Sequence, residues 1–351
     1  IGSITSYDGS FTIESNFATK TLIVTSLGYE TREIMIALYE NTNGLKIKLK
    51  PTQVELEEVE VVTTKRKKYK NKGNPAVDLI KKVVDNKKLN RIQNLETYHV
   101  EKYQKVELDI NNITQRFMNN PMFNNLQEIF NYVDTSEING KPFLPVYMYE
   151  SIADIYYRKT PKKYREWIKA SQAIGFEKFI DGQGLSAFIQ NIYQDIDIYE
   201  ANILFLEKDF TSPISTIAPS VYRFYILDTT SVDGLDCIEL GFMPRNDANY
   251  AFKGKMWIAN DSTYAVKKVS LGVTDKININ WINTFLIEQV FAHDDEHGML
   301  IKESHTVIDF DLAISDEGTG IFGKKSDYFR AYTINQPIAD SLMEGNEIQY
   351  H

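Results

Sequence analysis

Residues 221–243 read VYRFYILDTTSVDGLDCIELGFM, and this stretch decides the fold class of most of the chain. β-branched and aromatic residues gather on both sides of Asp233-Gly234, a dipeptide that favours a tight hairpin turn. The stretch therefore predicts strands over 221–228 and 236–243. The same pattern continues between further turn residues and predicts four more strands, over 251–259, 264–273, 279–292 and 299–312. Six strands in a row predict an antiparallel meander that must close round or cover one face with helices.

Strand-like patterning also precedes this meander. Apolar residues alternate over 98–110 and over 145–157. Between 75 and 90 they recur instead at helical spacing behind Pro75, a residue that favours the first turn of a helix. We therefore expect two more strands and one helix that packs a single face against the sheet.

Two segments are helical in spacing or mixed. Residues 122–133 have helical spacing, and 161–204 favours one or two short helices that break near Gly182 and Gly184. The expected fold is thus mainly β with minor α (α+β): a small β-sandwich followed by a larger antiparallel, curved sheet domain with a few helices. That larger domain is expected over 95–345.

The chain before residue 95 divides into two parts. Residues 1–62 alternate apolar and polar positions behind Asp8-Gly9, which predicts the β-sandwich. Residues 63–94 are expected to be a linker and a helix, and the linker has six Lys and Arg residues between 65 and 72. This basic run is either a solvated linker or a patch that faces an anionic membrane surface.

Composition excludes several classes of protein. The 351 residues include 43% hydrophobic residues, which is too many for a disordered chain. A single Cys excludes an intrachain disulfide. With 39 Lys and Arg against 48 Asp and Glu, the net charge is −9, so we expect no nucleic-acid partner, because such binding needs a basic surface.

Residues 1–62 resemble a known family. The motifs are a DGSFTI turn and strand at 8–13, TLIVTSLGYET at 21–31, and LEEVEVV at 56–62. They are similar to the carboxypeptidase-regulatory-like domain, which implies a transthyretin-like β-sandwich without peptidase activity. The opening strand of that family is mostly absent here, and the chain begins at Ile1 almost in mid-strand, so we expect an N-terminally truncated unit.

The rest of the chain resembles a second family. The motifs include Asn74-Pro75-Ala76, the segment LETYHVEKY at 95–103, and FKGKMWIANDSTYAV at 252–266. They look like a Bacteroidetes family of unknown function that follows a carboxypeptidase-regulatory-like domain and precedes an outer-membrane β-barrel. The resemblance implies the bacterial cell envelope, on the periplasmic side of the outer membrane or exposed on it. The 252–266 hairpin is also similar in architecture to periplasmic lipoprotein carriers, whose curved sheet holds an acyl chain.

Aromatic side chains give the best candidate for a contact surface. We expect a surface that binds a glycan, peptide or lipid, because aromatic rings give large amphipathic contact areas. The alternative is a sheet whose core and rim are simply aromatic. The candidate residues are Tyr147, Tyr149, Tyr156, Tyr157, Trp167 and Trp281.

Signals for chemistry are weak. His293 and His297, with His305 nearby, are candidate metal ligands, although their position between two strands favours a polar hairpin turn. Cys237 lies in an alternating strand and is expected to be a packing residue. The sequence has neither a G-x-S-x-G elbow nor a phosphate-binding loop. We therefore expect no catalytic residue and no cofactor.

Three functions follow in order. The first is a non-catalytic periplasmic or surface module of an outer-membrane protein, which acts in ligand binding or envelope assembly. Its partners would be envelope proteins or a C-terminal barrel of the same chain. The second is a lipid or lipoprotein carrier with an apolar cavity in the 221–312 sheet. The third is a metal-dependent hydrolase, which would require His293, His297 and His305 to converge.

Overall fold

The computed structural model divides the chain into two units, residues 1–58 with 114–144, and residues 59–113 with 145–351. The residues that it describes are 10–13, 21–24, 32–36, 44–49, 69–111, 113, 118–119, 133–135, 142–175, 194–274, 277, 279, 282–294, 296–311 and 320–350.

The first unit is described only in short pieces. β1 (Thr21–Val24) and β2 (Arg32–Met35) form an antiparallel pair in which Thr21 lies opposite Met35. Most of the expected β-sandwich lies outside the described residues, so the sandwich stays a prediction. Nearly all of the helix expected over 122–133 also lies outside them.

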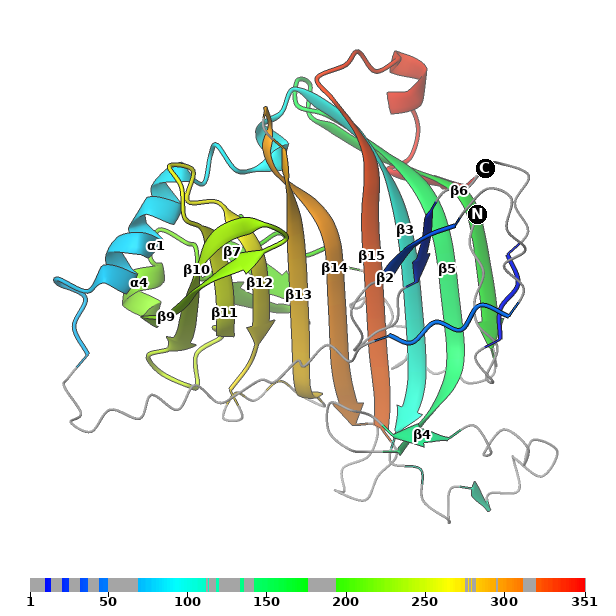
Figure 1. Ribbon diagram of the computed structural model, residues 1–351, viewed down its shortest axis with the longest axis horizontal. Helices are drawn as coiled ribbons and strands as arrows, with labels where there is room; N and C mark the ends of the chain where they lie inside the picture. The colour runs from blue at the N-terminus through cyan, green and yellow to red at the C-terminus, as the bar shows by residue number, and fades with distance from the viewer. Residues whose placement is uncertain are drawn as a thin grey trace. The chain divides into compact units, whose positions relative to one another are not determined.

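A twelve-stranded sheet is the framework of the second unit (Figure 1). Its strand order is β16-β6-β5-β3-β15-β14-β13-β12-β11-β10-β9, and the short β4 (Asp134–Thr135) pairs with the start of β5. Strands from β9 to β3 along this order are antiparallel, whereas β16 is parallel to β6. The bounds are β3 (Thr97–Asn111), β5 (Pro142–Arg158), β6 (Lys163–Gly175), β9 (Tyr222–Val232), β10 (Leu235–Pro244), β11 (Lys253–Ala259), β12 (Val266–Gly272), β13 (Ile282–Asp294), β14 (Gly298–Asp311), β15 (Gly320–Ile334) and β16 (Ile348–Tyr350).

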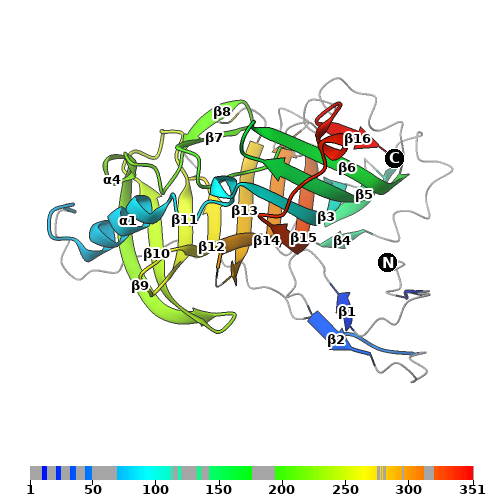
Figure 2. The same cartoon turned by 90° about the horizontal axis from the view of Figure 1, so that it is seen from above.

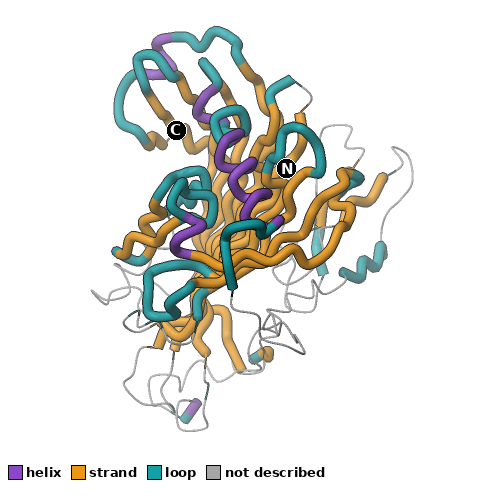
Figure 3. The backbone as a smooth tube through the Cα atoms, turned by 90° about the vertical axis from the view of Figure 1, so that its left-hand side faces the viewer, coloured by secondary structure: helices purple, strands orange, loops and turns teal. Residues whose placement is uncertain are grey.

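The predicted meander is confirmed. β9 to β14 follow one another as antiparallel neighbours, and Asp233 and Gly234 both have positive φ at the turn between β9 and β10. Strands predominate in the second unit and helices are few (Figure 3), so the mainly β fold with minor α is confirmed. The helix expected over 75–90 is α1 (Pro75–Asn86), whose N-cap Asn74 accepts a hydrogen bond from the Ala76 N–H at 3.0 Å.

Part of the prediction for 161–204 is wrong. Lys163–Gly175 is the strand β6, and a short hairpin of β7 (Asn202–Phe205) and β8 (Lys208–Thr211) follows later. Arg165 and Glu166 are buried on β6, and charged residues at buried positions hide the alternation that marks a strand. The expected breaks near Gly182 and Gly184 lie outside the described residues.

The sheet has two different faces. Residues two apart on a strand share a face, as do direct cross-strand partners, so the register places Phe285, Ile308, Leu108 and Val106 on one side. We call this side the inner face and the opposite side the outer face. The β7–β8 hairpin packs on the inner face through ring contacts with Phe285, and Figure 2 shows the sheet curving round this hairpin.

Aromatic rings fill the inner face over β9 to β13. Phe210 is fully buried and stacks on Phe252 at 4.8 Å, and both rings meet Phe285 edge-on. Each such ring contributes about 1.5–3 kcal/mol by leaving water. Among the described residues, no helix is long and apolar enough to cross a membrane.

Candidate functional site

The predicted aromatic contact residues do not share one surface. Alternation along β5 places Tyr157 on the inner face, where it is 4% exposed and stacks on Tyr98 at 4.9 Å. Tyr147 and Tyr149 have the same parity as Tyr157 and are half-buried. Tyr156 faces the other way and stacks on His99 at 4.7 Å on the outer face.

Two aromatic candidates remain. Trp167 lies directly opposite Asp154 in the ladder, and its Nε1 donates to the carbonyl of Leu342 at 3.1 Å. Trp281 lies outside the described residues. The sheet thus divides the predicted set between two faces, and Tyr157 serves the core.

The candidate metal ligands stand at a hairpin end. His297 Nδ1 lies 2.8 Å from Asp294 Oδ1 in the turn, and His293 lies opposite Met299 in the ladder. His305 Nδ1 lies 3.0 Å from Ser326 Oγ on β15. In the part of the chain that the structure describes, no three His, Cys, Asp or Glu side chains gather as metal ligands.

Cys237 is a buried thiol on β10. Burial raises its pKa, which favours the thiol over the nucleophilic thiolate. The structure therefore places it as the packing residue that the sequence predicts.

The sequence missed a group of charged side chains on the inner face. We call it the inner-face charge cluster and define it by Lys102, Glu166, Asp195, Lys325 and Asp327. Lys102 and Lys325 come from β3 and β15, Glu166 comes from β6, and Asp195 comes from the segment before β7.

Short contacts join the members of the cluster. Lys325 Nζ lies 2.6 Å from Asp195 Oδ1 and 3.2 Å from Asp327 Oδ2. Lys102 Nζ lies 2.8 Å from Glu166 Oε1. Gln104 Nε2 donates to Asp327 Oδ1 at 2.9 Å, because Gln104 and Asp327 are direct cross-strand partners. The register of three strands therefore assembles the cluster.

Burial separates Asp195 from the other members. The side chains of Lys325 and Asp327 are each 3% exposed, whereas that of Asp195 is 56% exposed. Burial lowers the pKa of Lys325, but the charges of Asp195 and Asp327 more than reverse this effect and raise it overall. Burial raises the pKa of Asp195, but Lys325 and Lys102 lower it to about 2. The cluster is therefore ionised at neutral pH.

An apolar cluster lies beside these charges. Its buried members are Tyr98, Val100, Ile155 and Tyr157, and partly buried Tyr164 and Phe329 pack against them. Tyr164 Oη donates to Glu166 Oε2 at 3.4 Å, which links the two clusters. Burial raises the pKa of Tyr164, as does the nearby Glu166, so this hydroxyl stays protonated and remains a donor.

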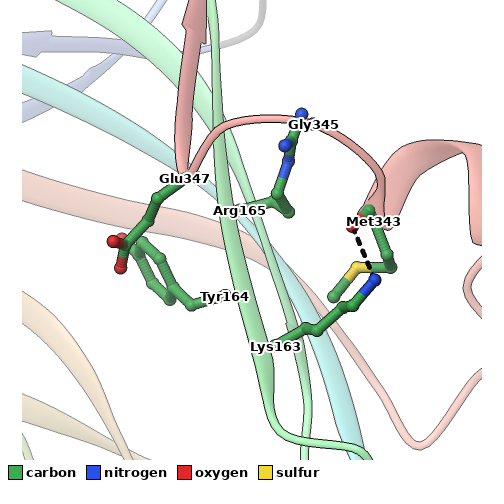
Figure 4. Close-up of a pocket in the computed structure, with 6 residues that line it drawn as sticks. All are labelled: Lys163, Tyr164, Arg165, Met343, Gly345 and Glu347. Carbon is green, nitrogen blue, oxygen red and sulfur yellow. Dashed lines mark hydrogen bonds between the residues drawn. The ribbon is translucent and has the colours of Figure 1, made fainter.

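A separate pocket of about 310 Å³ lies where the C-terminal segment returns to β6 (Figure 4). Lys163 Nζ donates to the carbonyl of Met343 at 3.3 Å, and the Glu166 N–H donates to the carbonyl of Glu347 at 2.8 Å. These bonds hold the C-terminal segment against the edge of the sheet, so we regard this pocket as structural. It is lined by Lys163, Tyr164, Arg165, Met343, Gly345 and Glu347.

The cluster is suited to holding an anion rather than to nucleophilic chemistry. A lysine that attacks a substrate needs a lowered pKa, whereas the carboxylates here raise the pKa values of both Lys102 and Lys325. An ammonium that stays protonated binds carboxylate or phosphate oxygens through charge-assisted hydrogen bonds. One signal in the sequence points to the site: Lys102 and Gln104 interrupt the buried alternation from Tyr98 to Leu108 on β3.

Comparisons with known proteins give a family. No curated protein matches the chain. Solved structures with a similar arrangement include a DUF1329 family protein from Desulfovibrio piger, at 9% identity over 77% of this chain and 98% of that chain with a TM-score of 0.30. They also include a putative outer membrane lipoprotein-sorting protein domain from Vibrio parahaemolyticus, at 9% identity over 75% and 94% with a TM-score of 0.29. We base no functional argument on similarity at this level. Residues 79–325 match the model of a family of unknown function (DUF5686), and the chain belongs to that family.

Proposed function

We propose that the second unit is a non-catalytic binding module that holds an amphipathic, lipid-like ligand on the inner face of its sheet. The observation that supports this proposal is the placement of a buried charge cluster directly beside a cluster of apolar and aromatic side chains. An amphipathic ligand has the same two parts, a charged or polar head and an apolar chain.

Buried charge is the main argument for a functional rather than a structural role. Taking ionised side chains out of water costs several kcal/mol for each ion, and well-packed apolar residues of similar volume often stabilise a fold as well or better. Lys102, Lys325 and Asp327 nevertheless stand at buried positions where the sheet elsewhere has apolar residues. Clusters with perturbed pKa values are therefore candidates for functional sites.

The position of the site differs from the one expected of a lipid carrier. The sequence placed the apolar cavity in the 221–312 sheet, but Phe205, Phe210 and Phe252 fill the inner face there. We place the ligand instead against β3, β6 and β15. We favour a lipid-like ligand over a glycan because the aromatic residues expected to form a glycan-type surface are divided between two faces.

We also propose that the module works in the bacterial cell envelope, with envelope proteins as its partners. The support for this part is the resemblance of both halves of the sequence to envelope families. A protein that delivers or holds a lipid there needs no reaction chemistry, which agrees with the protonated state of both lysines.

Binding of a neutral apolar probe to the purified chain tests the proposal. N-phenyl-1-naphthylamine is expected to bind saturably, and solvent extraction followed by mass spectrometry is expected to recover a co-purified lipid. Phe329→Ser next to the apolar cluster should weaken probe binding about tenfold, equivalent to ~1.4 kcal/mol. Its matched control is Tyr328→Ser, one residue away on the outer face, which should leave binding unchanged. A folded protein with neither a saturable probe site nor a lipid would contradict the proposal.

A further inference from the structure

Asp195 is unlike the other carboxylates of the inner-face charge cluster. Glu166 and Asp327 belong to strands, whereas Asp195 belongs to a segment without regular structure before β7. Its side chain is 56% exposed although its partner Lys325 is 3% exposed. Within the cluster, Asp195 is thus the carboxylate that solvent reaches and that is not anchored in the sheet.

The same residue makes the shortest contact to the buried ammonium. Lys325 Nζ lies 2.6 Å from Asp195 Oδ1, compared with 3.2 Å from Asp327 Oδ2 and 3.5 Å from the carbonyl of Gln194. An ammonium has three N–H donors. Because these acceptors already surround Nζ, an incoming oxygen must take the place of one of them, and Asp195 is the exposed one.

Charge also limits the site to one additional anion. The members that belong to the sheet are Lys102, Lys325, Glu166 and Asp327, whose charges sum to zero. Asp195 brings the cluster to −1, and a second anion at the same ammonium would bring it to −2 in surroundings with little water to screen the repulsion. Asp195 and an external anion are therefore alternatives.

We propose that Asp195 stands in for the anionic group of the ligand, and that an anionic amphiphile binds Lys325 by exchanging with the Asp195 carboxylate. This inference rests on the proposed function and specifies its ligand: an apolar chain that ends in a carboxylate or phosphate. The head accepts hydrogen bonds from Lys325 Nζ, and the chain lies along the apolar cluster of Tyr98, Val100 and Tyr157. In the unliganded protein, Asp195 keeps the buried ammonium paired.

The exchange makes affinity depend on the charge of the ligand in a specific way. A neutral amphiphile has no reason to displace Asp195, so its binding is indifferent to that side chain. An anionic amphiphile must compete with Asp195, so removal of the negative charge of Asp195 strengthens its binding. The two kinds of ligand therefore separate the exchange from simple apolar binding.

The test compares cis-parinaric acid with its methyl ester by fluorescence titration on the full chain. Asp195→Asn should bind the acid about tenfold more tightly and the ester within about twofold of the wild type, as expected for one charge-assisted contact freed from competition. Lys325→Met should lose about tenfold for the acid only, whereas Lys325→Arg, which keeps the charge, should retain the preference for the acid. The matched control is Asp197→Asn, two residues along the same segment, whose carboxylate pairs with Arg91 at 2.9 Å. It should change neither affinity.

The outcomes distinguish the two proposals. Equal effects of Asp195→Asn on acid and ester, or an unchanged acid affinity in a folded Lys325→Met, would overturn the exchange and leave apolar binding in place. Failure of both probes to bind the folded wild type would overturn the proposed function and the exchange with it.

Discussion

Two regions of the inner face have opposite chemistry although one sheet forms both. Over β9 to β13, Phe210, Phe252 and Phe285 fill the space under the β7–β8 hairpin with rings. Over β15, β3 and β6, the equivalent positions include Lys325, Lys102 and Glu166. The first region is what hydrophobic burial alone would select. The second carries a desolvation cost that folding does not require, so the comparison assigns stability to one region and ligand binding to the other.

The largest expected effect comes from emptying the aromatic region. Phe210→Ala removes a fully buried ring that contacts Tyr250, Phe252 and Phe285, and should lower the free energy of unfolding by about 3–5 kcal/mol. Urea denaturation measures this change. Leu204→Ala on the same hairpin is the control, because Leu204 is an exposed side chain and its loss should cost less than about 0.5 kcal/mol. Similar costs for the two variants would contradict a packed core here.

The second prediction tests whether the charge region is needed for stability. Lys102→Met alone should cost about 3 kcal/mol, because it leaves Glu166 as an unpaired buried charge. The double variant Lys102→Met with Glu166→Leu removes the pair together and should return to the wild-type free energy of unfolding or exceed it. A double variant as unstable as the single one would mean that the ion pair itself stabilises the fold, and the contrast between the two regions would fail.

The third prediction is a pH dependence that belongs to the charge region. The charges of Lys325 and Lys102 lower the pKa of Asp195 to about 2 in the folded state, below its ordinary value of 3.8. The unfolded chain therefore binds the proton more readily, so this contribution is present above about pH 4 and is lost as the pH falls through 2. Because Asp195 is half exposed, solvent screening reduces the contribution to about 1 kcal/mol or less.

Urea denaturation at pH 5 and at pH 2.5 measures this contribution. The wild type should lose more stability between the two values than Asp195→Asn does, whereas Asp197→Asn should not reproduce the loss of this particular acid sensitivity. Identical pH profiles for the wild type and Asp195→Asn would mean that Asp195 is not paired with Lys325 in solution.

The aromatic region was predictable from the sequence because its signals are local. Asp233-Gly234 fixes a turn, and the alternation on both sides of it fixes two strands. The charge region has no such signal. Lys102 and Lys325 are more than 200 positions apart, and only the pairing of β3 with β15 brings them together. The charged residues at buried positions also disguise β6 and β15 as non-strand segments, so the feature that makes the site is the feature that hides it.

The smallest expected effect concerns the outer face, where ion pairs are also abundant. Lys105 Nζ lies 2.9 Å from Glu107 Oε1, on the same strand as Lys102 but on the opposite side. Both side chains are partly exposed, so water already solvates them and the pair contributes about 0–0.5 kcal/mol. Lys105→Met should therefore leave both urea stability and cis-parinaric acid binding within error of the wild type, in contrast to Lys102→Met and Lys325→Met. A loss of acid binding in Lys105→Met would show that long-range charge, rather than the buried ammonium groups of the inner face, attracts the ligand.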